Sequence, residues 1–184
     1  NYPDPFYLQS PWSSSTSEHV SVAKMSVNSE EALVIRKVDA ISSEIVGVTR
    51  DLVRFETVNP PGDVSDIADR LYSYLNELGF KTEKLETSRG RVNVLGTLEG
   101  TASPKQHAGT ILFNGHMDVV PVADLDQWTV APFEAQVRGD AIVGRGTCDM
   151  KGALASCLVA AKAIVDTGIA RHGRILIHLV ADEE

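Results

Sequence analysis

The sequence has few cysteines, no long apolar run and no excess of positive charge, and each shortage excludes a class of protein. Two cysteines among 184 residues are too few for a disulfide framework. If the region after Met150 is helical, Cys157 also lies too far along it to reach Cys148. No apolar run approaches the roughly twenty residues of a membrane-spanning helix, which predicts no membrane partner. A net charge of −8 with scattered Lys and Arg predicts no nucleic-acid partner. The cysteine usage favours a reducing compartment and hence a cytoplasmic location.

The composition divides the chain into two parts. Residues 1–29 are rich in Ser, Pro and aromatic side chains, which predicts a leader or flexible arm able to dock through Tyr2, Phe6, Tyr7 and Trp12. The whole chain is 43% hydrophobic, enough for one globular core, and that core is expected to begin at about residue 30.

Hydrophobic periodicity predicts helices that alternate with buried strands. Ser29 is expected to cap one long helix, which ends before the breaker Asn59-Pro60-Pro61-Gly62. Further helices are predicted over 63–78, ending at Gly79, and over 150–166. Strands are predicted over 80–86, 92–98, 110–114 and 174–181, with a hairpin over 133–143. The segment 110–114 is nearly all apolar, as in strands buried on both faces. This order predicts an α/β sandwich with ligand groups at the strand ends.

Three segments place carboxylates directly after an apolar stretch. They are 115–121, which contains His116 and Asp118, 144–152, which contains Asp149, and the run Asp182-Glu183-Glu184. An ionised carboxylate is costly in such a place unless a cation compensates it. One imidazole and several carboxylates gathered at one sheet edge are the ligands that a divalent metal requires.

Each segment also has an alternative interpretation. His116 can bind a metal while Asp118 accepts its other ring N–H, or the pair can be an ordinary turn. Asp149, after Gly144 and Gly146, can bridge two metal ions or can simply cap a helix.

The acidic run and the neighbouring cysteine leave choices open as well. The run can be a solvated turn, or its two glutamates can point in opposite directions, one as a ligand and the other as a proton carrier for water. A cysteine hydrolase that uses Cys148 is disfavoured, because no motif ties a base to it and Asp149 opposes its thiolate.

Taken together, the motifs resemble the M20 metallopeptidase family, which includes acetylornithine deacetylase, succinyl-diaminopimelate desuccinylase, aminoacylase and glutamate carboxypeptidase. The resemblance runs from about residue 31 to 184. It rests on 113–121, Trp128, Pro132-Phe133, 144–152 and 182–184. It implies a three-layer αβα sandwich with a mostly parallel mixed sheet, the zinc-exopeptidase-like catalytic domain. Residues 30–184 would be the N-terminal portion of this domain.

The resemblance also implies a role for each residue. His116 would bind one zinc ion, Asp149 would bridge two, and Glu184 would bind the second. Asp118 would orient His116, and Glu183 would be the general base. The cofactor implied is a pair of Zn²⁺ ions, with Co²⁺ or Mn²⁺ as alternatives, and a cis peptide is implied after Asp149.

The function implied is metal-dependent amide hydrolysis, by a deacylase or exopeptidase acting on N-acyl amino acids or small peptides. The family also uses a further carboxylate, a C-terminal histidine and a dimerisation domain, which this sequence does not contain. The alternative expectation is therefore a catalytically inactive truncated fragment with an incomplete metal site. A homodimer is expected only for the full-length protein.

Overall fold

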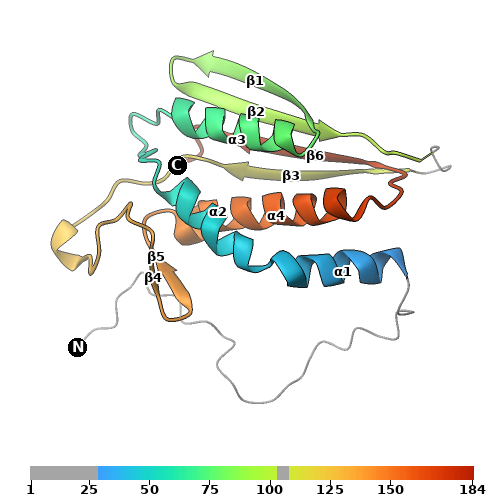
Figure 1. The fold of residues 1–184 in the computed structure, drawn as a ribbon. Coiled ribbons are helices and arrows are strands. Elements are labelled where there is room, and N and C mark those ends of the chain that lie inside the picture. Colours follow the sequence, from blue (N-terminus) through green and yellow to red (C-terminus); the bar gives the residue numbers. More distant parts are fainter. Residues whose placement is uncertain (1–28, 103–107) are drawn as a thin grey trace.

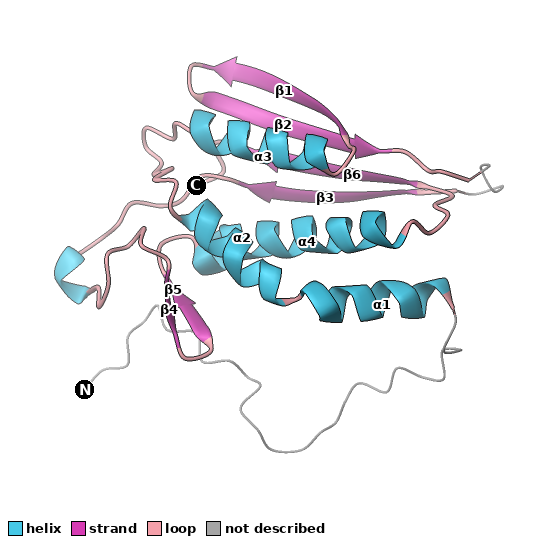
Figure 2. Ribbon diagram, viewed as in Figure 1, coloured by secondary structure: helices cyan, strands magenta, loops and turns pink. Residues whose placement is uncertain are grey.

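A computed structural model describes residues 29–102 and 108–184, so the predicted arm and its aromatic residues lie outside the described residues. Three helices precede the first three strands, and the crossover back to the last strand contains a small hairpin and the helix α4, as Figures 1 and 2 show. The helical elements are α1 (Glu30–Ile41), α2 (Ser43–Val53), α3 (Ser65–Glu77), η1 (Leu125–Gln127), η2 (Thr147–Lys151) and α4 (Gly152–Thr167). The strands are β1 (Lys81–Ser88), β2 (Arg91–Leu98), β3 (Thr110–His116), β4 (Gln136–Arg138), β5 (Ala141–Val143) and β6 (Arg174–Val180).

The first helix begins where the sequence predicts but is not continuous. Ser29 is its N-cap, with Oγ accepting a hydrogen bond from the Ala32 amide at 3.2 Å. The expectation of one long helix is wrong, because Ser42 separates α1 from α2. Its hydroxyl donates to the Asp39 carbonyl at 2.9 Å, the kind of local side-chain bond that competes with regular helical pairing.

Several other predicted elements are confirmed. The helix predicted over 63–78 is α3, and Gly79 follows it at φ +83°, a left-handed conformation that glycine adopts without strain. The strands predicted to be neighbours are β1 and β2, which pair antiparallel. The predicted hairpin is the two-stranded sheet of β4 and β5.

The larger sheet is mixed, with strand order β1-β2-β6-β3. The β1–β2 and β2–β6 pairs are antiparallel, and only β6–β3 is parallel. The expectation of a mostly parallel sheet is therefore wrong for the described strands. The cause lies in the connections, since a short turn joins β1 to β2, whereas helix α4 lies in the crossover between β3 and β6.

Helices α3 and α4 pack on the same face of this sheet. A Cβ added to Gly96 of β2 would meet Leu75 of α3 at 2.9 Å, and one added to Gly115 of β3 would meet Leu154 of α4 at 2.6 Å. By register, both glycines lie on the face that carries the buried Ile177 of β6. The α/β class is confirmed, but the described residues form two layers of the predicted three (Figure 1).

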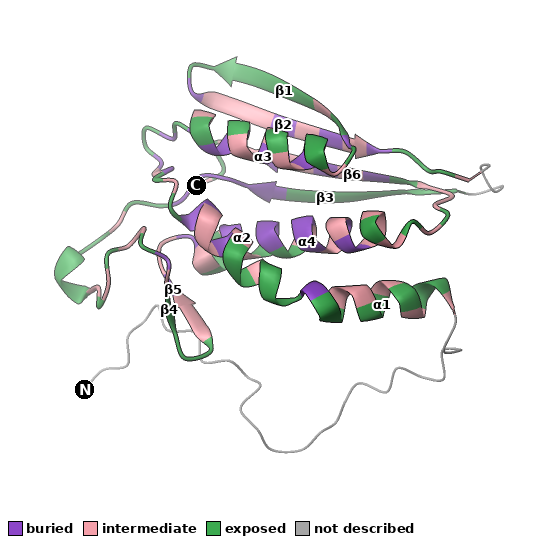
Figure 3. Cartoon of the chain, in the orientation of Figure 1, coloured by how far each residue is buried: buried purple, intermediate pink, exposed green. Residues whose placement is uncertain are grey.

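Strand β3 is more exposed than its apolar sequence predicts. Ile111 is 59% exposed and Leu112 is 56% exposed, so the expectation of a strand buried on both faces is wrong here. Figure 3 shows much of β3 in the colour of exposed residues. The strand lies at the edge of the sheet, and among the described elements only α4 and η2 share a substantial contact with it besides β6. Because β3 and β6 are parallel, the segments that follow them leave the sheet at the same end.

Candidate metal centre

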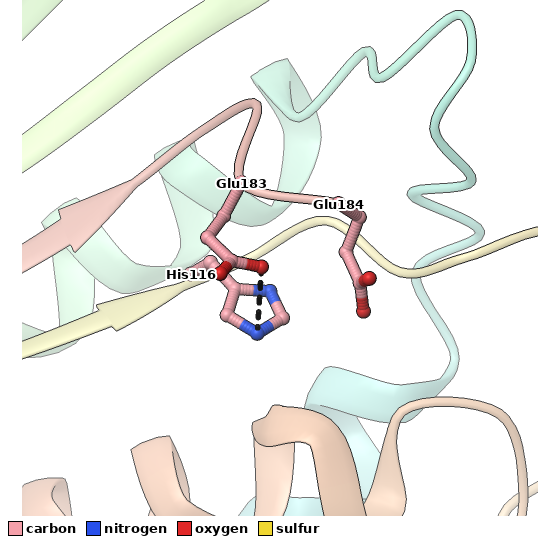
Figure 4. A group of neighbouring side chains, drawn as sticks. All are labelled: His116, Glu183 and Glu184. Atoms are coloured by element: carbon pink, nitrogen blue, oxygen red, sulfur yellow. Dashed lines mark ion pairs between the residues drawn. The ribbon is translucent and has the colours of Figure 1, made fainter.

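The three acidic segments meet at the carboxyl ends of β3 and β6. His116 is the last residue of β3, Asp149 lies in η2, and the glutamates follow β6. The His116 Nε2 atom is 3.0 Å from Asp149 Oδ1 and 3.7 Å from Glu183 Oε2. One ligand atom each from His116, Glu183 and Glu184 all lie within 4.8 Å of one another. Figure 4 shows these three side chains.

The imidazole of His116 is held between two acceptors. It is 5% exposed, and Nδ1 donates to the backbone carbonyl of Asp118 at 3.0 Å, while the Asp118 carboxylate is farther away at 3.7 Å. The sequence predicts that the carboxylate makes this contact, whereas the structure assigns it to the carbonyl. Burial alone lowers the pKa of His116, but the bonds to Asp149 and to the Asp118 carbonyl, with the charge of Glu183, raise it overall.

This donor set fits a divalent cation. With Nδ1–H directed at a carbonyl, the Nε2 lone pair faces carboxylate oxygens, an arrangement satisfied either by a proton on Nε2 or by a cation. Imidazole nitrogen and carboxylate oxygen are zinc ligands, and a carbonyl acceptor on the other ring nitrogen is the usual support for a ligating histidine.

Asp118 organises the backbone of the acidic run. It is fully buried, and its Oδ2 atom accepts from the amides of Glu183 and Glu184 at 3.0 and 3.1 Å and from Asn59 Nδ2 at 2.9 Å. Its Oδ1 atom has no hydrogen-bond partner in the described part of the chain. Asp118 therefore acts on the glutamates that follow β6 as well as on His116.

The two glutamates do not point in opposite directions, so that expectation is wrong. Asp182 has φ +67°, which ends the extended conformation of β6 before the glutamates are reached. Strict alternation of side chains applies only to extended backbone. Both carboxylates therefore approach the His116 imidazole.

Asp149 does not serve as a helix cap. The N-cap residues of η2 and α4 are Gly146 and Lys151, and neither helix has a side-chain cap bond. Gly146 has φ +82°, and a Cβ there would lie 2.6 Å from Val119 Cγ1, so the turn that carries Asp149 requires glycine. The peptide bond from Asp149 to Met150 is cis, as the family resemblance implies.

Two residues near this centre were not singled out from the sequence. In the sequence, Asn59 is identified only as part of a helix breaker, and Lys151 only lies within the segment 144–152. Lys151 is fully buried, and its Nζ donates to the Phe55 carbonyl at 2.7 Å. Burial lowers its pKa to about 7, against the opposing effect of the Asp118 charge. Neither the burial of Lys151 nor the contacts of Asn59 with distant residues can be recognised from a pattern in a single sequence.

The buried Lys151 predicts a pH-dependent stability in the metal-free chain. Between its lowered pKa of about 7 and the ordinary 10.5, the unfolded chain holds this proton and the folded chain does not. The free energy of unfolding should therefore rise with pH in that window, by up to about 1.4 kcal/mol per pH unit from this group. Urea titrations at several pH values, in the presence of a chelator, measure the free energy of unfolding of the chain and of Lys151→Met. The variant should lack the part of the pH dependence that comes from Lys151. Equal slopes would contradict the burial of a titrating amine.

The two cysteines lie near the centre in sequence but do not pair with each other. Cys148 and Cys157 are both free, and burial raises the pKa of Cys157. Both ring nitrogens of His116 face oxygen atoms, so the alternative of a cysteine hydrolase gains no base from it. None of the described helices is long and apolar enough to span a membrane.

Comparison with known proteins gives matches both in sequence and in structure. The family model described as peptidase family M20/M25/M40 matches residues 112–184. N-formyl-4-amino-5-aminomethyl-2-methylpyrimidine deformylase of Bacillus subtilis (strain 168) is 33% identical over 150 residues, which are 81% of this chain and 35% of that protein. Succinyl-diaminopimelate desuccinylase of Ruegeria pomeroyi is 37% identical over 138 residues, 74% of this chain and 34% of that protein. The chain thus spans about a third of the length of these curated relatives.

Solved structures share the fold. An M20 family metallo-carboxypeptidase from Sulfolobus solfataricus superposes with a TM-score of 0.63 at 25% identity, covering 74% of this chain and 30% of that one. Human carnosine dipeptidase 1 superposes with a TM-score of 0.69 at 20% identity, covering 80% of this chain and 33% of that one.

Proposed function

Since the chain belongs to peptidase family M20/M25/M40, we propose that it carries the metal-binding and proton-transferring segments of a metal-dependent amide hydrolase. The observation that supports this most strongly is the convergence of His116, Glu183 and Glu184 within 4.8 Å, with Asp149 at 3.0 Å from the imidazole. These three carboxylates repel one another around one buried imidazole, and a bound cation would relieve that repulsion.

The proposed roles separate binding from proton transfer. His116, Asp149 and Glu184 would hold a dinuclear zinc site. Bound zinc supplies Lewis acidity toward an amide carbonyl and lowers the pKa of water. The Glu183 carboxylate takes a proton from the attacking water and returns it to the leaving nitrogen. Asp118 fixes the backbone of both glutamates while its carbonyl holds the Nδ1 proton of His116.

The proposed substrates are N-acyl amino acids or small peptides. The relatives named as a deformylase and a desuccinylase both remove an acyl group from nitrogen, and the carboxypeptidase and dipeptidase names describe peptide substrates. All four reactions break a C–N bond of an amide, which is the chemistry that the proposed roles serve.

The proposal predicts amine release that depends on zinc. Incubation of the chain with N-formyl, N-acetyl and N-succinyl amino acids, and with dipeptides, should release primary amine in the presence of Zn²⁺ and none after chelation. A fluorescent amine reagent follows the reaction. Zinc binding without turnover would limit the proposal to the metal site, and a chain that neither binds zinc nor releases amine would overturn it.

A further inference from the structure

The loop between α2 and α3 contacts all three acidic segments. Thr57 Oγ1 donates to the Met117 carbonyl at 2.7 Å, and Val58 forms a parallel β-bridge with Val119. The Phe55 carbonyl accepts from Lys151, which lies two residues after Asp149. This loop, residues 55–62, is defined here as the hub loop. The sequence alone indicates only that a helix ends there.

Asn59 is the residue of the hub loop that reaches the acidic side chains themselves. Its Nδ2 donates to Asp118 Oδ2 at 2.9 Å and to Asp182 Oδ1 at 3.0 Å. The residue is 6% exposed, and its backbone N–H donates to the Val119 carbonyl at 2.9 Å. Both side-chain neighbours are acceptors, so the amide nitrogen, with its two hydrogens, is the end that fits between them.

The surroundings leave this side chain little freedom. Gly62 has φ +68°, and a Cβ at that position would lie 2.8 Å from Asn59 Oδ1, so the turn closes directly over the amide. Asp182 is also held by Arg91, whose Nε lies 2.9 Å from the same Oδ1 atom that accepts from Asn59. The Asn59 amide therefore bridges two carboxylates that would otherwise repel each other.

Asn59 influences the two glutamates through the hydrogen bonds that Asp118 accepts from their backbone. The Asp118 oxygen that accepts from Asn59 is the same oxygen that accepts from the amides of Glu183 and Glu184. Asp182, the other acceptor, directly precedes those glutamates and makes the left-handed turn that directs them toward His116. Asn59 thus acts on the segment that presents the glutamates through two carboxylates, Asp118 and Asp182.

We propose that Asn59 is a positioning residue of the metal centre, which clamps Asp118 to Asp182 and thereby sets the glutamates against His116. This inference rests on the proposed function, since it assumes that the glutamates and His116 hold a metal. Asn59 touches no ligand atom of that site, and its effect is transmitted through Asp118 and Asp182.

The test is zinc affinity of the 184-residue chain, measured by competition with a chromophoric chelator below the melting temperature of every variant. Asn59→Ala should lower the affinity by about 10- to 100-fold, the usual effect of removing an outer partner of a metal ligand. Asn93→Ala is the matched control. It removes one hydrogen bond between an amide side chain and the backbone, from the Ala181 N–H to Asn93 Oδ1 at 2.9 Å. This bond lies just after β6, and it does not involve the carboxylates of Asp118 and Asp182.

A double-mutant cycle separates clamping from general destabilisation. In a chain that already carries Asp182→Ala, the further change Asn59→Ala should cost much less affinity, because the clamp is already broken. Circular dichroism verifies that each variant is folded. Equal losses for the Asn59 and Asn93 variants, or additive losses in the cycle, would overturn the inference. If the unchanged chain binds zinc no better than His116→Ala, the proposed function itself fails, which is a different outcome.

Discussion

Replacing Glu183 with glutamine is expected to lower turnover by about 10²- to 10⁴-fold, the usual contribution of a general base, while zinc affinity changes little. Glutamine keeps the size of the side chain and removes its capacity to accept a proton from water. Asp118 accepts a hydrogen bond from the backbone amide of residue 183 and not from its side chain, so the backbone of residues 182–184 should keep its conformation. Zinc-dependent amine release and zinc titration are measured on the same preparation.

The control for this variant is Glu99→Gln, an identical exchange at an exposed position after β2, far along the sheet from His116. It should leave both quantities unchanged. Glu183 lies within reach of His116 together with Glu184, so a second outcome is informative. If Glu183→Gln loses zinc as well as turnover, Glu183 is a ligand and the proposed division of roles between the two glutamates is wrong.

Replacing His116 with alanine is expected to lower zinc affinity by more than about 100-fold, beyond the loss typical of outer partners. His116 supplies the nitrogen of the described donor set, and its ring lies at the point where β3, η2 and the end of β6 meet. His178→Ala is the matched control, because His178 lies on β6 directly beside β3, opposite Asn114. Its imidazole is outside the group of candidate ligands, so affinity should be retained. A similar loss in both variants would show that the effect is one of folding.

The sequence predicts secondary structure correctly where a helix end or a turn is determined by neighbouring residues alone. The cap at Ser29, the left-handed Gly79 and the strand pair β1–β2 are each determined by residues close together in the chain. The convergence of His116 and Asp149 with the glutamates is a matter of topology. Parallel strands joined by a helix bring their carboxyl ends to one edge, so the sequence predicts that these residues gather there.

What the sequence does not predict depends on contacts between distant segments. The exposure of β3 depends on which elements cover it. The approach of both glutamates to His116 depends on the left-handed turn at Asp182. Asn59 joins carboxylates that lie 59 and 123 residues away along the chain, and no local pattern records such a pairing.

X-ray absorption at the zinc edge of the zinc-loaded chain tests most directly whether His116 and the acidic segments bind a shared cation. The account predicts a shell of nitrogen and oxygen at about 2.0–2.2 Å with the scattering signature of an imidazole and no sulfur near about 2.3 Å. The imidazole signature should vanish in His116→Ala and persist in His178→Ala. A sulfur shell, which would indicate Cys148, or a spectrum of zinc surrounded by water alone would contradict the convergence of His116 with the acidic segments on a shared cation.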